Sequence, residues 1–311
     1  MATIVFGGAL SHSPLMNVPL QGDHDLVQRF SAAVGELGRL LSEAEPDVLV
    51  VFGPDHFRAL FYDLMPAFVV GVGALDGWGD WASPVGPFVT RPALAKHILT
   101  SVMADGFEPA FSYDLKVDHG VSQPLQLLGL ERFPVVPVLI NAAGPPLPLP
   151  ARCYRFGAAV ARAIAGFPEN LRVAVLGSGG LSHDPPTPSP ESDDPEVVER
   201  AVHGKAIGFA ASKERETGLL GRTATLARRI NADWDRMVLD RFARGEAEAL
   251  AAELTTEGIQ RDAGSGGQEI RTWLAVACAL GDPEMDVLSY DPIPALVTGM
   301  GVVAYTPESA S

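Results

Sequence analysis

The sequence predicts an α/β fold in which a central mixed sheet is flanked by helices within a single domain. Short runs rich in β-branched residues and bounded by glycine alternate with longer stretches of helical periodicity, which is typical of this class. A composition of 47% apolar and 20% charged residues suits a chain that buries a large core. We therefore interpret residues 1–311 as one domain and expect its ligand site in the crevice beyond the strand ends.

Six runs are expected to form strands because each is short, apolar and bounded by glycine or polar residues. They are Thr3–Ala9, Asp47–Gly53, Ala67–Gly73, Val135–Ile140, Arg172–Gly177 and Ala295–Tyr305. The first expected helix begins after an Asp23 cap, and its apolar residues Phe30, Val34, Leu37 and Leu41 fall on one face. Further helices are expected at Arg91–Ala104, Ala151–Ala165 and Gln268–Leu280.

The C-terminal half departs from this alternation. Residues 184–195 hold five prolines and four acidic residues, which exclude a helix or a central strand, so we expect an exposed loop. Residues 196–262 are charged and have few β-branched runs. This composition predicts a helical excursion from the sheet within the same domain.

The charge balance argues against nucleic-acid binding. With 23 basic and 38 acidic residues the formal net charge is −15, whereas a protein that binds phosphates needs a basic face. No apolar run approaches the roughly 18 residues of a membrane-spanning helix, and the first residues do not resemble a signal peptide. Two distant cysteines form neither a disulfide framework nor a zinc cluster. We expect a soluble, cytoplasmic protein.

Four of the seven histidines stand in loop sequences of Gly, Pro, Ser or Asp, three of them just beyond an expected strand. They are His12 in LSHSP, His56 in FGPDHF, His119 in VDHG and His183 in GSGGLSH. Loops at strand ends position functional groups on a rigid scaffold. Four buried imidazoles at one sheet edge would be costly to desolvate unless a metal or a substrate proton used them.

Two imidazoles and one carboxylate on one face of an ion form the non-haem Fe(II) arrangement, which leaves positions open for substrate and oxygen. Spacing alone does not choose the carboxylate. Four residues stay open at this point: Asp55, Asp118, Asp184 and Glu269. Ser265 and Gln268 have the spacing of a capping box, which would place Glu269 in the first turn of a helix.

With these motifs the sequence resembles the type III extradiol ring-cleavage dioxygenases. The matching pieces occur in family order over nearly the whole chain, less clearly at 196–262 and beyond residue 282. They are LSHSP (10–14), PDH (54–56), FYDLMPAFVVGVGA (61–74), VDHGVSQPL (117–125), VPVLIN (136–141), GSGGLSHDPP (177–186) and QEIRTW (268–273).

The resemblance implies that His12, His56 and Glu269 bind Fe(II). It further implies that His183 is the general base that deprotonates a catechol, and that His119 is the general acid of a later step. The implied partners are O2 and a catechol such as 3-(2,3-dihydroxyphenyl)propionate or 2,3-dihydroxycinnamate, cleaved in aromatic catabolism. The family also implies a homo-oligomer.

Three further residues are candidates around this centre. Asp118 could orient or tune His119 from behind, and Arg58 or Lys116 could bind the carboxylate arm of the substrate. Competing hypotheses keep the same residues: a dioxygenase for an aminophenol or protocatechuate, a zinc hydrolase, and a ligand-binding relative without turnover. The pair His119 and His183 favours the dioxygenase, because a binding protein has no need of two proton-handling groups.

Overall fold

The computed structural model describes residues 1–19, 22–207, 223–226 and 229–307. Eight strands form one sheet in the order β4-β3-β5-β2-β6-β1-β8-β7. Their bounds are β1 Thr3–Leu10, β2 Val48–Gly53, β3 Phe68–Gly77, β4 Ala110–Val117, β5 Val135–Ile140, β6 Arg172–Ser178, β7 Asp286–Ile293 and β8 Thr298–Tyr305. The predicted single-domain α/β fold with a mixed sheet is confirmed.

The four central strands β5, β2, β6 and β1 are parallel, and the strands on either side of this group, β3 and β8, pair with it in the antiparallel sense. The carboxyl ends of the central strands therefore meet at one edge of the sheet. In open α/β sheets this edge is where ligands bind.

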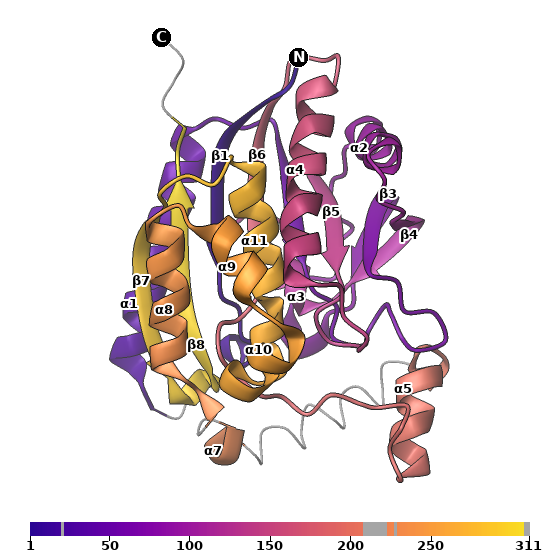
Figure 1. The fold of residues 1–311 in the computed structure, drawn as a ribbon, viewed down its shortest axis with the longest axis vertical. Coiled ribbons are helices and arrows are strands. Elements are labelled where there is room, and N and C mark those ends of the chain that lie inside the picture. Colours follow the sequence, from indigo (N-terminus) through magenta and orange to yellow (C-terminus); the bar gives the residue numbers. More distant parts are fainter. Residues whose placement is uncertain (20–21, 208–222, 227–228, 308–311) are drawn as a thin grey trace.

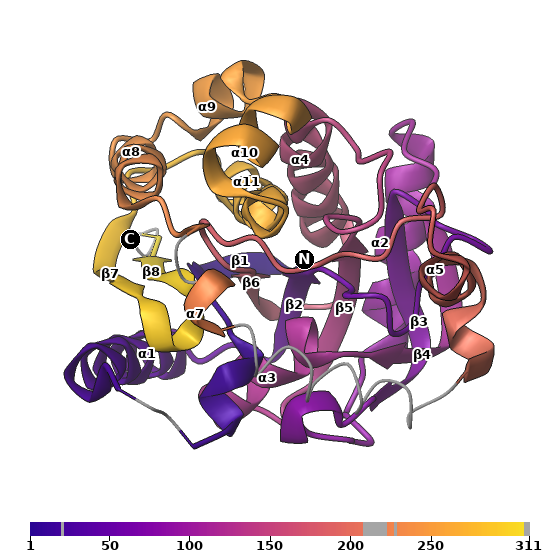
Figure 2. The ribbon, with the colours of Figure 1, turned by 90° about the horizontal axis from the view of Figure 1, so that it is seen from below.

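Helices cover both faces of the sheet (Figure 1 and Figure 2). Helix α1 (His24–Glu43) packs on β7 and β8 on one face, whereas α4 (Pro150–Gly166) packs with α2 (Pro92–Ala104) and α11 (Ile270–Ala279) on the other. The short helix α3 (His119–Leu127) lies against β2, β4 and β6. No helix of the described ranges is long and apolar enough to cross a membrane.

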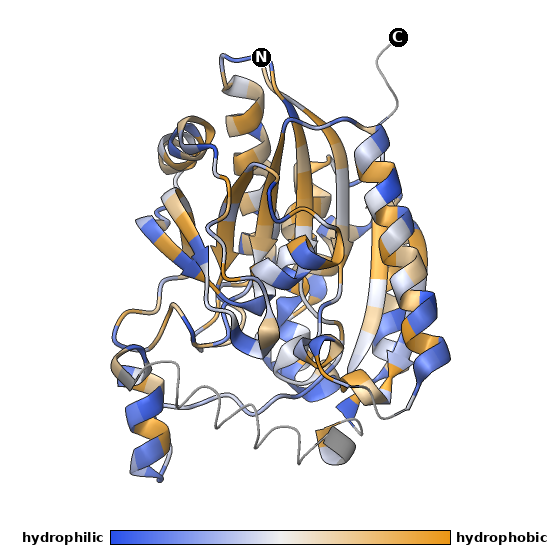
Figure 3. Cartoon of the chain, turned by 180° about the vertical axis from the view of Figure 1, so that it is seen from behind, coloured by the Kyte–Doolittle hydropathy of each residue, from blue (hydrophilic) through white to orange (hydrophobic). Residues whose placement is uncertain are grey.

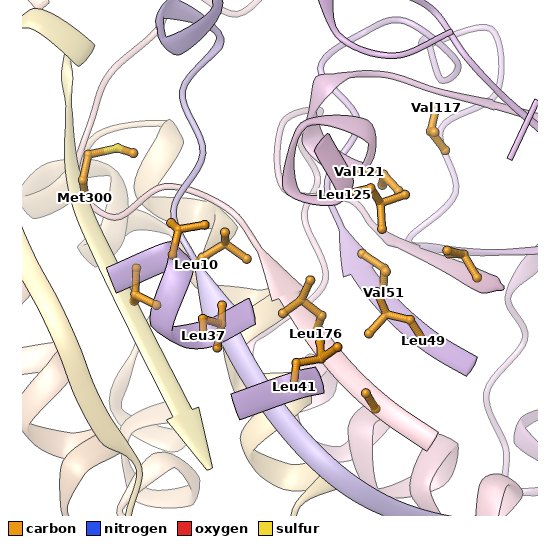
Figure 4. Close-up of a cluster of buried hydrophobic side chains, with 14 of the residues drawn as sticks. Leu10, Leu37, Leu41, Leu49, Val51, Val117, Val121, Leu125, Leu176 and Met300 are labelled. Atoms are coloured by element: carbon orange, nitrogen blue, oxygen red, sulfur yellow. The ribbon is translucent and has the colours of Figure 1, made fainter. Parts of the chain in front are cut away.

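The strands are apolar on both sides because both faces of the sheet are covered. In β2, Leu49 and Val51 face a core that includes Leu37 and Leu41 of α1, as Figure 4 shows. The alternate residues of β2 face a second core with α2 and α4. Figure 3 shows the apolar strands of the sheet and the polar outer faces of the helices around them.

The helical excursion is confirmed for its described residues. It contains α5 (Pro195–Ile207), α7 (Thr223–Leu226), α8 (Ala232–Ala243), α9 (Ala247–Glu253) and α10 (Thr256–Ala263). Residues 208–222 and 227–228 of the predicted excursion lie outside the described residues. The segment 184–194 has no regular secondary structure, and α5 begins at Pro195, which the sequence analysis had assigned to the loop.

The sequence analysis missed two strands and misplaced one strand start and one helix cap. The predicted strand Ala295–Tyr305 begins only at Thr298, because residues 294–296 form a 3-10 turn, η5 (Pro294–Leu296). Strands β4 and β7 were not predicted, because both lie at sheet edges and carry polar residues, and β7 also contains Pro292. Asp23 does not cap α1 with its side chain, since its backbone is left-handed (φ 53°). Its carboxylate instead accepts the backbone N–H of Ala295 at 2.8 Å.

Candidate active site and metal centre

Three adjacent central strands deliver the first group of functional residues. His12 follows the end of β1, His56 follows the end of β2, and Ser178 is the last residue of β6. Because β2, β6 and β1 are neighbours and parallel, these residues converge at one edge. The ring centroids of His12 and His56 lie 5.3 Å apart. These residues therefore lie at the sheet edge where the sequence analysis expects a ligand site.

Each of these two histidines is held through Nδ1. Ser178 donates its hydroxyl to the carbonyl of Gly120 at 2.5 Å, so its oxygen accepts Nδ1–H of His12 at 3.0 Å. Nδ1 of His56 lies 3.0 Å from a carboxylate oxygen of Asp118. Because the bond made by one ring nitrogen determines the role of the other, Nε2 of both rings is left to serve as a ligand.

Glu269 lies where these Nε2 atoms converge. One of its oxygens is 3.1 Å from Nε2 of His56, and the other is 3.9 Å from Nε2 of His12. Nε2 of His183 lies 3.7 Å from the first oxygen. The backbone N–H of Gly180 donates to the second oxygen at 2.6 Å and fixes the carboxylate. Three imidazoles thus surround one buried carboxylate.

The electrostatics of this group suit a divalent cation. Burial alone would raise the pKa of Glu269, but its hydrogen bond with His56 and the surrounding imidazoles hold that pKa well below its usual range. Burial alone would lower the pKa of His56, but Asp118 and Glu269 outweigh it and raise that pKa well above its usual value. Burial lowers the pKa of His12 to about 3, which keeps its ring neutral and able to coordinate. A cation between His56 and Glu269 would replace the proton that this pair stabilises.

His183 approaches the same carboxylate from a glycine-rich loop. Its Nδ1 lies 3.0 Å from the carbonyl of Leu181, which can only accept, so Nδ1 carries the proton and Nε2 is an acceptor. A Cβ atom on Gly180 or Gly266 would lie 2.4 Å or 2.1 Å from the His183 ring. Both glycines are therefore required for the ring to fit. The contact with His183 thus accounts for the last glycine of the GSGG sequence, Gly180.

The predicted capping box is not formed. Ser265 makes no side-chain cap, and its hydroxyl donates to the carbonyl of Pro185 instead. Gln268 donates to the carbonyl of Thr256. Glu269 is the last residue of a 3-10 turn, η4 (Gly266–Glu269), and directly precedes α11. The expected position beside a helix start is right, although the capping mechanism is wrong.

Asp118 supports a different histidine from the one expected. Its carboxylate accepts the backbone N–H of His56 at 2.6 Å as well as the ring contact, and also the backbone N–H of Gly120 at 2.8 Å. The carboxylate that contacts Nδ1 of His119, at 2.6 Å, belongs to Asp80. Asp118 therefore orients His56, and the hypothesis that it orients His119 is corrected.

The two remaining candidate carboxylates, Asp55 and Asp184, hydrogen-bond to the backbone of nearby loops and not to the histidine rings. Asp55 accepts three backbone N–H groups, those of residues 58, 59 and 60, and thereby shapes the turn after His56. Burial and the charge of Asp118 raise the pKa of Asp55 to about 7. Asp184 pairs with Arg229 and accepts the backbone N–H of Ser265. Among the candidates, Glu269 alone contacts two of the histidines that the strand ends deliver, His12 and His56.

A cavity of about 610 Å³ opens onto the histidines. We call the side that carries His12, His56, His119 and His183 the strand-end wall. We call the side formed by residues 185–188 and by α5 the loop wall. A cavity of this size accommodates a small aromatic molecule.

Two arginines line this cavity and the predicted lysine does not. Arg58 is buried, and its Nε lies 3.6 Å from Asp80. Arg200 of α5 is half-buried on the loop wall and has no ion-pair partner within the described ranges. Lys116 is exposed on β4 outside the cavity lining, with its Nζ 4.5 Å from the ring centroid of Trp78.

Sequence reasoning missed three residues of the site. Ser178 had a detectable signal, because it directly follows the predicted strand Arg172–Gly177 within the GSGG motif. Arg200 lies in a charged helical stretch that looks solvated, and Asp80 lies outside every motif named above.

Two groups of side chains are close enough to hold a metal ion. The ligand atoms of His12, His56 and His119 all lie within 4.8 Å of one another, as do those of Asp80, Asp118 and His119. The second group is occupied by hydrogen bonds, so it forms a supporting layer.

Comparisons with known proteins identify the family of the chain. Residues 8–301 match the family described as the catalytic LigB subunit of aromatic ring-opening dioxygenase. The chain is 38% identical to 2,3-dihydroxyphenylpropionate/2,3-dihydroxicinnamic acid 1,2-dioxygenase of Photorhabdus laumondii, covering 96% of both chains. It is 36% identical to the enzyme of the same name from Rhodococcus jostii, covering 94% of this chain and 95% of the relative.

A solved structure shares the fold. The crystal structure of an uncharacterized protein from Escherichia coli K12 covers 96% of this chain and 99% of its own, with a TM-score of 0.52 and 15% identity. At that identity the likeness concerns the fold alone. The family match over most of the chain, with full-length relatives above 30% identity, shows that the chain belongs to the LigB family of extradiol ring-cleaving dioxygenases.

Proposed function

We propose that the chain is an Fe(II)-dependent extradiol dioxygenase for a catechol that carries a carboxylate arm, such as 3-(2,3-dihydroxyphenyl)propionate or 2,3-dihydroxycinnamate. The observation that carries the proposal is the convergence of two Nδ1-anchored imidazoles on the buried carboxylate of Glu269. Two further histidines, His119 and His183, line the same cavity. The printed names of the relatives support the choice of substrate.

His12, His56 and Glu269 are the residues that would hold the metal. Two neutral nitrogen ligands and one carboxylate are the donor set of non-haem Fe(II) sites, and Nε2 of both rings faces the carboxylate. Bound Fe(II) would supply open coordination positions and a path for electrons from the catechol ring to O2. The protein's own tasks are orientation and proton transfer.

His183 is the proposed general base. Its Nδ1–H is held by the neutral carbonyl of Leu181, so Nε2 keeps its lone pair, 3.7 Å from Glu269. A catechol hydroxyl placed beside the metal ligands would lie within reach of this nitrogen. His183 would then accept the proton that the hydroxyl loses on binding, a role that contributes roughly 10²- to 10⁴-fold to rates.

His119 is the proposed general acid. Its ring stacks on His56 with centroids 4.3 Å apart, and its Nδ1 lies 2.6 Å from Asp80. A ring whose Nδ1–H is held by a carboxylate can carry a second proton on Nε2 and deliver it to a leaving oxygen. The two histidines thus differ in their Nδ1 partner, a carboxylate for His119 and a carbonyl for His183.

Arg200 is the proposed partner of the substrate's carboxylate arm. It lines the cavity on the loop wall and is half-buried, where a charge-assisted hydrogen bond is stronger than in water. Arg58 also lines the cavity, but its charge is shared with Asp80. Lys116, the other residue predicted for this role, lies outside the lining and is left out of the proposal.

Metal exchange separates this proposal from its alternatives. Metal-free protein would be loaded anaerobically with Fe(II) or with Zn²⁺ and assayed with oxygen for ring cleavage of a panel of catechols, aminophenols and protocatechuate. We expect yellow ring-cleaved product from the Fe(II) protein only, fastest with 3-(2,3-dihydroxyphenyl)propionate or 2,3-dihydroxycinnamate. Preference for an aminophenol or for protocatechuate would overturn the substrate assignment. Inert Fe(II) protein would favour the hydrolase or the binding protein.

A further inference from the structure

Asp80 grips His119 at two points. Its Oδ2 atom lies 2.6 Å from Nδ1 of the ring, and its Oδ1 atom accepts the backbone N–H of His119 at 3.1 Å. The carboxylate is fully buried, and Ser83 also donates its hydroxyl to Oδ1 at 3.3 Å. A buried carboxylate that holds both the main chain and the ring leaves the imidazole no freedom to rotate or to exchange its two nitrogens.

The hydrogen bonds with Asp80 determine which ring nitrogen of His119 is available for proton transfer. A carboxylate oxygen can only accept, so the proton lies on Nδ1 and Nε2 is the remaining nitrogen. The ring lies against His56 (4.3 Å) and His12 (5.3 Å) and lines the cavity. Without Asp80 the ring could adopt the other tautomer or turn away from the proposed metal ligands.

The loop that carries Asp80 has an unfavourable backbone. Trp81 and Ala82, which complete the short turn η2 (Asp80–Ala82), both have a left-handed φ, 53° and 56°. Residues other than glycine hold this conformation only where the surrounding structure enforces it, which is most frequent at functional sites. Trp81 and His119 line the same cavity. The turn is therefore shaped around the site.

The neighbouring carboxylates do not share this task. Asp118 precedes His119 in the chain but is bound to His56 and Gly120. Arg58 lies 3.6 Å from Asp80 and offsets its buried charge. In the part of the chain that the structure describes, Asp80 is the carboxylate that hydrogen-bonds the His119 ring.

We propose that Asp80 is the positioning residue of His119, fixing its ring orientation and its Nδ1–H tautomer for proton transfer at Nε2. This inference rests on the proposed function for its effect on turnover, but not for the tautomer. Asp80→Asn keeps the shape of the side chain but replaces a group that only accepts hydrogen bonds with one that can also donate them. A side-chain amide can donate to Nδ1 and so permit the opposite tautomer.

The first readout is independent of catalysis. In diamagnetic, zinc-loaded protein, ¹⁵N NMR of the His119 ring is expected to show a proton on Nδ1 in the unmodified chain and loss of that state in Asp80→Asn. An unchanged ring tautomer in Asp80→Asn would overturn the proposal. This result stands even if the chain cleaves no catechol, so failure here is distinct from failure of the proposed function.

The second readout separates positioning from folding by a double-mutant cycle. Asp80→Asn is expected to lower kcat roughly tenfold or more with little change in KM, since general acid catalysis contributes about 10²- to 10⁴-fold. In a His119→Gln background the same substitution is expected to have no further effect. Equal losses of kcat in both backgrounds would show a structural role and contradict the proposal.

A matched control and a second variant complete the test. Asp282 accepts two backbone N–H groups, of Ala247 and Glu248, beyond the far end of α11, so Asp282→Asn is expected to leave kcat and the tautomer unchanged. If Asp80→Asn does not fold, Asp80→Glu retains the carboxylate and is expected to keep the Nδ1–H tautomer. A folded Asp80→Glu protein with the opposite tautomer and full kcat would refute the positioning role.

Discussion

The strand-end wall and the loop wall of the cavity differ in how their side chains are held. On the strand-end wall, His12 and His119 are almost fully buried, and each is anchored by a neighbour, Ser178 or Asp80. On the loop wall, residues 185–188 include three prolines, which have no N–H to donate, and Arg200 has no ion-pair partner in the described ranges. The difference suggests that the sheet edge carries the chemistry and the loop wall selects the substrate.

The largest effect is expected from the proposed metal ligands. His12→Ala and Glu269→Gln should each lose bound iron and turnover. The loss of iron affinity should exceed the roughly 10- to 100-fold that follows when only a hydrogen bond to a ligand is removed. Iron content measured by mass spectrometry of the metal, with kcat alongside, checks this. Full iron content in Glu269→Gln together with its loss in His119→Ala would reassign the third ligand to His119.

The two proton-handling histidines should give the next largest effect. His119→Ala and His183→Ala are each expected to retain iron and to lose about 10²- to 10⁴-fold in kcat. Steady-state kinetics on iron-reconstituted protein provide the measurement. If either variant lost as much iron as His12→Ala, that histidine would be a metal ligand and its assignment to proton transfer would be wrong.

Asp118 and Asp80 offer a matched pair of buried carboxylates behind two stacked rings. Because Asp118 holds Nδ1 of His56, Asp118→Asn should weaken iron binding by about 10- to 100-fold, whereas Asp80→Asn should leave it unchanged. Anaerobic competition with a chelator measures both affinities. Equal iron affinity in the two variants would contradict the assignment of Asp118 to the metal ligand His56.

On the loop wall, Arg200→Gln should change specificity rather than chemistry. Loss of a hydrogen bond to a charged group costs about 1.5 to 3 kcal/mol, which corresponds to a rise in KM of roughly 10- to 100-fold for 3-(2,3-dihydroxyphenyl)propionate. The KM for uncharged 3-propylcatechol should stay unchanged. Equal changes for both substrates would mean that Arg200 does not recognise the carboxylate.

The smallest effect belongs to Lys116. Its exposed side chain lies outside the cavity and contacts Trp78, so Lys116→Ala should leave kcat and KM within about twofold of the unmodified chain. The same kinetic assay with the carboxylated catechol applies. A specific rise in KM for this substrate would restore Lys116 as a carboxylate ligand.

The two walls also differ in how far they could be predicted. His12, His56 and His183 follow strands whose apolar runs are visible in the sequence, so their convergence follows from parallel strands meeting at one edge. The choice of Glu269 came from family resemblance, because spacing left four carboxylates open. In the structure, Glu269 lies 3.9 Å from His12 and 3.1 Å from His56.

The loop wall and the supporting carboxylates escaped prediction for physical reasons. Arg200 lies on a helix whose charged residues resemble any solvated face, and nothing in 184–195 fixes where that helix packs. Asp80 is 39 residues from His119, and their contact exists only after β3 and β4 have paired. Asp118 was assigned by adjacency to His119, although its carboxylate points to His56. Side-chain direction depends on tertiary structure, which sequence proximity does not reveal.

The origin of the oxygen atoms in the product tests the central claim most directly. Iron-reconstituted protein would convert 3-(2,3-dihydroxyphenyl)propionate under ¹⁸O2 in ordinary water, with the ring-cleaved product analysed by mass spectrometry. Extradiol cleavage at the His12, His56 and Glu269 centre predicts that labelled oxygen enters the product as the catechol is consumed. A ring-cleaved product that carries no ¹⁸O from labelled O2 would contradict dioxygenase chemistry at this centre.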